Sequence, residues 1–214
     1  MPGSPLTLPN VITLARIAAC PVIFFLALSP DTGLRSWAFV LFVVAAVSDI
    51  WDGYLARRYG LVTNMGKLLD PFADKLLLVA SYVPIYMVSQ RGGTLDSLPW
   101  WGAMPLWVMV VIFGREVFIT LFRSFAARRG VVIAAGAAGK RKALFQAIFA
   151  GAALLWYPLR AFGAERGFDS AIWDAWFAFH GAVVAISLGI AVVLTVYSLI
   201  DYLWSYRTLV GIRD

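Results

Sequence analysis

Long apolar segments recur along the whole of this chain and constrain its fold more than any other feature. A helix needs about 20 mostly apolar residues to cross the hydrocarbon core of a bilayer. Because 61% of the 214 residues are hydrophobic and the mean hydropathy is +0.80, the chain is far too apolar for a soluble domain of this length. The sequence therefore predicts an integral membrane protein, built as one all-α membrane domain over residues 1–214.

The apolar segments predict six transmembrane helices. The expected spans are residues 10–28, 37–58, 66–89, 105–127, 143–160 and 173–204. The residues before Asn10 are expected to form a short segment at the membrane interface. The first apolar run contains Arg16 and lacks a small-residue cleavage site, so we expect it to be a retained span rather than a signal peptide.

Lysine and arginine are distributed unequally between the two expected membrane faces. The loops after the second and fourth spans, together with the C-terminal tail, hold more of them than the opposite loops. Because cytoplasmic loops carry the excess of these residues, both termini are predicted to be cytoplasmic. The residues compared are Arg58, Lys67, Arg128, Arg129, Lys140, Arg141, Lys142, Arg207 and Arg213 on one face, and Arg35, Arg91, Arg160 and Arg166 on the other.

Four aspartates occur at helical spacings inside the second and third apolar segments. Asp49 and Asp52 share one face of the second span, and Asp70 and Asp74 share one face of the third. The loop between these spans allows a reversal, so the two faces can meet at the cytoplasmic end. Four carboxylates cannot stay ionised together in a poorly hydrated site unless cations neutralise them. An intramembrane Arg16 also needs a partner, and these carboxylates are the expected one.

Carboxylate-only ligation favours hard divalent ions, so we expect two Mg²⁺ ions, with Mn²⁺ as the alternative metal. Two-metal sites clamp the attacking and leaving oxygens of a phosphoryl displacement. Gly53 and Ala56 leave room for a phosphate-bearing ligand, and Arg57 can pair with a phosphate oxygen. The residues therefore predict two-metal phosphoryl transfer. The opposing interpretation is that the aspartates are ordinary helix-end charges.

The same residues form a longer pattern that resembles the signature of the CDP-alcohol phosphotransferases. It reads Asp49-x2-Asp52-Gly53-x2-Ala56-Arg57-x8-Gly66-x3-Asp70-x3-Asp74. Members of that family exchange the CMP of a CDP-linked lipid for an alcohol. The resemblance implies that all four aspartates bind metal and that Asp74 is also the general base. It implies that the donor is bound by Asn10, Thr13, Gly53, Ala56, Arg57, Thr63 and Gly66.

Basic residues in and after the fourth span favour an acceptor that carries a phosphate. Arg115, Arg123, Lys140 and Lys142 would surround a phosphate that enters from the cytoplasm. Two alternatives stay open. Arg115 can pair with Glu116 or with a signature aspartate, and the lysines can simply mark the cytoplasmic face.

These segments, with LPNVITLARIAACPV and GKLLDPFADKLL, are similar to the bacterial phosphatidylglycerophosphate synthases. The similarity implies that CDP-diacylglycerol and sn-glycerol 3-phosphate give phosphatidylglycerophosphate and CMP, in a homodimer of the bacterial inner membrane with a cytoplasmic active site. Inositol phosphate, serine or phosphatidylglycerol is the alternative acceptor within this family. An ion transporter is the alternative outside it, although its charges would be spread across the bilayer depth.

Small residues in the last span predict a tight helix contact. Gly181, Ala185 and Gly189 recur every four residues, either within the chain or at a dimer seam. Membrane lipid is an expected partner and nucleic acid is not. Cys20 is the only cysteine, so no internal disulfide can form.

Overall fold

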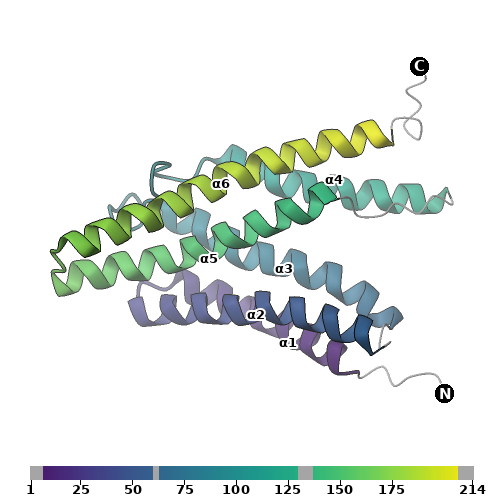
Figure 1. Cartoon of the computed structure of the whole chain (residues 1–214), viewed down its shortest axis with the longest axis horizontal. Helices are drawn as coiled ribbons and strands as arrows, with labels where there is room; N and C mark the ends of the chain where they lie inside the picture. The colour runs from purple at the N-terminus through teal and green to yellow at the C-terminus, as the bar shows by residue number, and fades with distance from the viewer. Residues whose placement is uncertain (1–6, 60–62, 130–136, 207–214) are drawn as a thin grey trace.

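The computed structural model describes residues 7–59, 63–129 and 137–206, which form helices joined by turns. The helices, in chain order, are α1 (Leu8–Leu28), α2 (Thr32–Arg58), α3 (Asn64–Ser89), α4 (Leu106–Arg128), α5 (Ala137–Arg166) and α6 (Ala171–Ser205) (Figure 1). The prediction of an all-α fold with six helices is confirmed. The segment expected at the membrane interface lies outside the described residues, apart from the first turn of α1.

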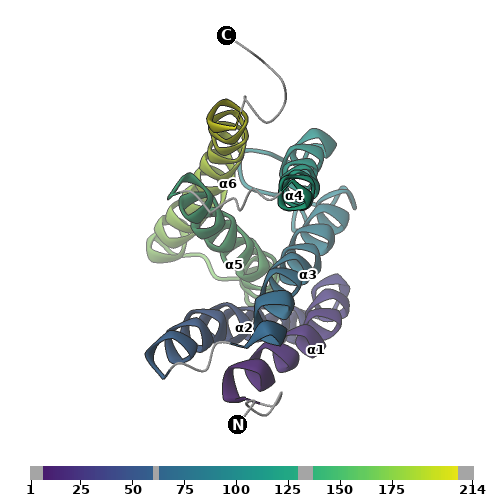
Figure 2. The same ribbon diagram turned by 90° about the vertical axis from the view of Figure 1, so that its right-hand side faces the viewer.

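The helices form two groups that meet in the middle of the bundle. α1 packs along both α2 and α3, and α5 packs along α6. Contacts of α2 and α3 with α5 join the groups, while α4 packs against α6 (Figure 1, Figure 2). Fully buried side chains fill the space between the helices, among them Ile23, Tyr82, Phe149 and Leu188. The strong α1 contacts matter for function, because α1 lies beside both helices that carry the aspartates.

Five of the described helices are long and apolar enough to cross a membrane, namely α1, α2, α3, α5 and α6. α4 differs because Arg115, Glu116 and Arg123 interrupt its apolar sequence, so its membrane crossing stays a prediction. Outward-facing apolar side chains suit a lipid environment; Phe25 is 71% exposed and Ile172 is 82% exposed. The chain is thus an integral membrane protein.

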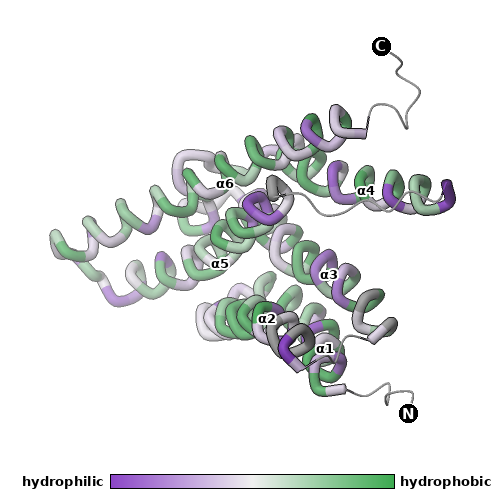
Figure 3. Tube along the Cα trace, turned by 45° about the vertical axis from the view of Figure 1, so that its right-hand side comes forward, coloured by the Kyte–Doolittle hydropathy of each residue, from purple (hydrophilic) through white to green (hydrophobic). Residues whose placement is uncertain are grey.

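One end of the bundle gathers the polar ends of several helices. α1, α3 and α5 begin at this end, and α2, α4 and α6 finish there (Figure 1). Hydrophilic stretches of α3 and α4 lie toward the same end (Figure 3). The two aspartate-bearing segments and the basic residues of α4 and α5 therefore share one end of the molecule. Arg207 and Arg213, used above to predict orientation, lie outside the described residues.

The small residues of α6 make a contact within the chain. A Cβ added to Gly181 would lie 3.3 Å from Pro99 Cβ and 3.4 Å from Trp156 Cη2. One turn further along, the indole N–H of Trp101 donates to the carbonyl of Ala185 at 3.1 Å. Of the two contacts predicted for this stripe, the structure has the intramolecular one.

Candidate active site

Arg16 of α1 joins aspartates that come from two different helices. Its Nη1 donates to Asp49 of α2 and lies 3.4 Å from Asp74 Oδ1 of α3, while its Nη2 donates to Asp52 of α2. The Arg16 side chain is completely buried, whereas 43% of the Asp49 side chain and 60% of the Asp74 side chain are exposed. The expected partnership between Arg16 and the carboxylates is confirmed.

Thr13 lies one turn before Arg16 and brings in the fourth carboxylate. Its hydroxyl lies 3.0 Å from Asp70 Oδ1 and 3.4 Å from Asp52 Oδ2. Two side chains on one face of α1 thus contact all four carboxylates of the predicted metal site. The spacing of the aspartates placed them on two helix faces, and the structure shows that α1 brings these faces together.

The four carboxylates suit a hard divalent ion in their donor chemistry, because all their ligand atoms are oxygens. Among the described side chains, one guanidinium faces the four carboxylates, so within this part of the chain it balances only part of their negative charge. In the described part of the chain, no three acidic, histidine or cysteine side chains are placed to hold an ion as they stand. Arg16 lies among three of the carboxylates, so an ion shared by them would require Arg16 to move.

Residues predicted to bind the donor form a compact group at the start of α1 and α3. The amide of Asn10 donates to Thr63 Oγ1 at 3.0 Å, and the backbone N–H of Gly66 also donates to that oxygen at 3.0 Å. Asn10 is buried, and a Cβ on Gly66 would approach its Oδ1 to 2.9 Å. Thr63 is the N-cap of α3, so it fixes the first turn of the helix that carries Asp70.

The other predicted donor residues lie near the end of α2. Gly53 directly follows Asp52 in the helix and is partly buried. The side chains of Ala56 and Arg57 lie outside the described part of the structure. The structure therefore places Thr13 against the carboxylates, with Asn10, Thr63 and Gly66 grouped one helical turn away along α1 and α3. It leaves the position of the Arg57 guanidinium open.

Two of the four predicted acceptor residues meet around Glu116. Arg115 Nη1 lies 3.2 Å from Glu116 Oε1, and the ammonium of Lys142 on α5 donates to the same oxygen. Lys142 is buried, whereas Lys140 is exposed. Of the alternatives open for Arg115, pairing with Glu116 is the one found. Glu116 thus holds two cations together where α4 and α5 meet.

Arg123 packs against α6 and not within the group around Glu116. Its guanidinium carbon lies 6.0 Å from the ring centroid of Tyr202, which is itself buried. The Nε atoms of Arg115 and Arg123 are buried without a hydrogen-bond partner among the described residues. Both arginines therefore keep a buried donor that an anion could accept from.

Tyr202 and Lys75 make contacts between helices around the site that the sequence reasoning missed. Lys75 directly follows Asp74, and its ammonium donates to Thr120 Oγ1 on α4 at 2.7 Å, so it links the carboxylate helix to the arginine helix. A lysine within the aspartate pattern could have suggested this link. Tyr202 gave no such signal, because a tyrosine near the end of an apolar span usually indicates only the membrane interface.

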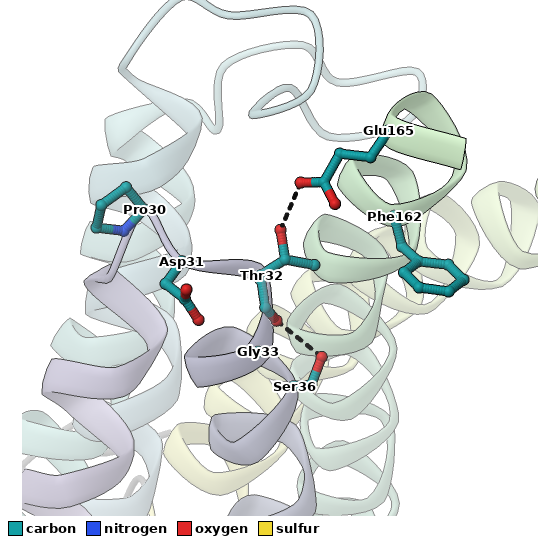
Figure 4. Close-up of a pocket in the computed structure, with 7 residues that line it drawn as sticks. All are labelled: Pro30, Asp31, Thr32, Gly33, Ser36, Phe162 and Glu165. Carbon is teal, nitrogen blue, oxygen red and sulfur yellow. Dashed lines mark hydrogen bonds between the residues drawn. The ribbon is translucent and has the colours of Figure 1, made fainter. Parts of the chain in front are cut away.

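A cavity of about 610 Å³ lies at the opposite end of the bundle, where α2 begins and α5 ends. Figure 4 shows Asp31, Thr32 and Glu165 among its lining residues, with the Thr32 hydroxyl donating to Glu165 at 3.3 Å. None of the predicted site residues lines it. Its ionisable lining groups are both acidic, which does not suit a phosphate-bearing substrate.

Comparison with known protein families gives one match that spans nearly the whole chain. Residues 6–204 match the CDP-alcohol phosphatidyltransferase family. This range contains the four aspartates, the Arg16 and Thr13 contacts, and the basic residues of α4 and α5. The family resemblance inferred from the spacing of the aspartates is confirmed.

Three relatives illustrate the range of names among the similar proteins. A Bacillus subtilis CDP-diacylglycerol–glycerol-3-phosphate 3-phosphatidyltransferase is 38% identical over 160 residues, covering 69% of this chain and 76% of the relative. A probable phosphatidylglycerophosphate synthase of Mycobacterium tuberculosis is 35% identical over 212 residues, covering 97% of this chain and 85% of the relative. A CMP-forming cardiolipin synthase of Streptomyces coelicolor is 34% identical over 128 residues, covering 58% and 54%.

Proposed function

The chain belongs to the CDP-alcohol phosphatidyltransferase family, and from this premise we propose that it transfers the phosphatidyl group of CDP-diacylglycerol to sn-glycerol 3-phosphate. The products are phosphatidylglycerophosphate and CMP. The observation that carries the proposal is the meeting of four carboxylates on Arg16 and Thr13, at the same end of the bundle as the Arg115–Glu116–Lys142 group. The names of the Bacillus and Mycobacterium relatives support the choice of acceptor.

Asp49, Asp52, Asp70 and Asp74 are the residues that would hold divalent cations. Two Mg²⁺ ions, or Mn²⁺ in their place, would neutralise the donor diphosphate and the departing CMP. Thr13, which contacts Asp52 and Asp70, would orient the cytidine end of the donor together with the group formed by Asn10, Thr63 and Gly66. Gly53, Ala56 and Arg57 complete that donor site in the last turns of α2.

Asp74 is the proton acceptor in the proposed reaction. It is the most exposed of the three aspartates bound by Arg16, so its carboxylate is accessible to a substrate hydroxyl. The acceptor hydroxyl gives its proton to an Asp74 carboxylate oxygen and attacks the phosphorus that bears diacylglycerol. A new phosphorus–oxygen bond forms, and the bond to the CMP oxygen breaks.

The acceptor phosphate binds between α4, α5 and α6. Arg115, Arg123 and Lys142 are buried or partly buried cations there. The Nε atoms of the two arginines lack hydrogen-bond partners within the described segments. Lys140 joins them from the exposed first turn of α5. A compact, water-soluble phosphate fits such a group better than serine does, because serine carries no phosphate to pair with it.

We also propose the setting in which the reaction occurs. The chain forms one domain in the bacterial inner membrane, with both termini and the active site on the cytoplasmic side, as the distribution of basic residues predicts. A homodimer is the expected assembly on family resemblance. The small residues of α6 do not supply its seam, because the segment before α4 covers Gly181 and Ala185.

Cardiolipin synthesis is the second candidate function. The Streptomyces relative is named a cardiolipin synthase, and its reaction would take phosphatidylglycerol instead of glycerol 3-phosphate. That acceptor is itself a membrane lipid, so it would have to reach the carboxylates from the bilayer. The buried Lys142 of α5 and the partly buried arginines of α4 favour the soluble acceptor.

An acceptor panel tests the proposed function. Purified protein in micelles with CDP-diacylglycerol and Mg²⁺ is expected to release CMP and form phosphatidylglycerophosphate when sn-glycerol 3-phosphate is added. Phosphatidylglycerol, inositol phosphate and serine, tested separately, are expected to leave CMP release at the level without acceptor. Release with one of those three but not with glycerol 3-phosphate would overturn the assignment.

A further inference from the structure

Arg16 is the one described cation that contacts the carboxylates of both α2 and α3. Its Nη1 lies between Asp49 on α2 and Asp74 on α3, and its Nη2 reaches Asp52. The side chain is fully buried, and its Nε is buried without a hydrogen-bond partner in the described ranges. The guanidinium is therefore committed to the carboxylates and not to solvent.

The position of Arg16 reduces the electrostatic repulsion between the carboxylates. Carboxylates brought together in a site of low polarity repel one another unless a cation lies between them. While no divalent ion is bound, Arg16 offsets part of this repulsion. Its Nη1 occupies the space between Asp49 and Asp74, where an ion shared by those two residues would lie.

We propose that Arg16 is a resident counter-cation, which holds the α2 and α3 carboxylates together before divalent ions bind and leaves Asp49 and Asp74 when they do. The inference rests on the proposed function only in taking the four aspartates as the ion site. Arg16 is thus a positioning residue: it acts through the aspartates, and it competes with the ions for them. The protein then folds without metal, but it binds metal less tightly than it would without Arg16.

Direct Mn²⁺ titration, followed by the electron paramagnetic resonance of free Mn²⁺ and without substrate, tests the competition. Arg16→Met is expected to bind Mn²⁺ about tenfold more tightly than the wild type, because no side chain has to be displaced first. Lys75→Met is the matched control. It also removes one positive charge beside Asp74, but its ammonium binds Thr120, so we expect a change of no more than about twofold.

Thermal unfolding gives a second readout that does not depend on activity. In EDTA the Arg16→Met protein lacks the guanidinium that pairs with its carboxylates, so adding Mg²⁺ should stabilise it more than the wild type. The rise in Tm is expected to be about 3–5 °C larger in the variant. Arg16→Lys keeps the charge but cannot reach both helices at once. Its increase in Tm on adding Mg²⁺ should therefore lie between those of the wild type and Arg16→Met.

The outcomes separate this inference from the proposed function. Equal or weaker Mn²⁺ binding by Arg16→Met, with normal binding by the wild type, overturns the competition and leaves the enzyme assignment intact. Absence of Mn²⁺ binding by the wild type would instead contradict the ion site itself. Purification of Arg16→Met only in the presence of Mg²⁺ would support the proposal, because folding of the variant would then depend on metal. Failure to fold in both Mg²⁺ and EDTA contradicts the proposal, since metal would not replace Arg16.

Discussion

Replacing Asp74 by asparagine lowers the rate of CMP release by about 10²- to 10⁴-fold, the range typical of losing a general base. Asparagine keeps the shape of the side chain but cannot take the proton of the acceptor hydroxyl. The fold should survive, because Asp74 is 60% exposed and its contact with Arg16 is a long one of 3.4 Å. Initial rates of CMP release at saturating donor and acceptor measure the effect.

A matched substitution shows whether the loss is specific to the site. Asp169→Asn changes an exposed aspartate in the turn between α5 and α6, at the opposite end of the bundle, and should retain the wild-type rate. Size-exclusion profiles and helix content should be the same for both variants. Turnover by Asp74→Asn within a fewfold of the wild type would remove Asp74 as the base.

Replacing Lys142 by methionine raises the KM for glycerol 3-phosphate by about 10- to 100-fold. This is the expected cost of one charge-assisted hydrogen bond to the acceptor phosphate. The KM for CDP-diacylglycerol should change by less than about twofold, because Lys142 lies with Glu116 and Arg115 and not with the carboxylates of α2 and α3. Steady-state kinetics with each substrate varied in turn separates the two constants.

Arg141 provides the control for Lys142. It directly precedes Lys142 in α5 but is exposed, so Arg141→Met removes an equal charge without touching the Glu116 group. We expect both KM values of that variant to stay near the wild-type values. An unchanged KM for glycerol 3-phosphate in Lys142→Met would place the acceptor phosphate elsewhere.

Most of the helix boundaries could be predicted from the sequence, because apolar length is a strong signal for a membrane helix. The third span was expected at 66–89, and α3 covers Asn64–Ser89. The fifth span was expected at 143–160, whereas α5 runs from Ala137 to Arg166. Its extra first turn holds basic residues that were interpreted as a loop, and pairing with Glu116 lets Lys142 lie buried in a helix.

The acidic half of the site could be predicted because its spacing follows the helix period. Four aspartates at intervals of three and four residues fix two helix faces, and the intramembrane Arg16 requires a partner, so both predictions needed only local rules. The basic half depends on how distant helices pack. The packing of α4 against α5 and α6 brings Arg115 and Lys142 to Glu116 and Arg123 to Tyr202. A single sequence gives no spacing rule for such contacts between distant helices.

The central claim is that the carboxylates of α2 and α3 hold the divalent ions of the transfer reaction. X-ray diffraction at the manganese absorption edge, from crystals grown with Mn²⁺ and CDP-diacylglycerol, locates such ions directly. We predict two anomalous peaks about 3.5–4 Å apart, bounded by Asp49, Asp52, Asp70 and Asp74. Crystals that contain the donor but show no anomalous peak among these four side chains would contradict the account.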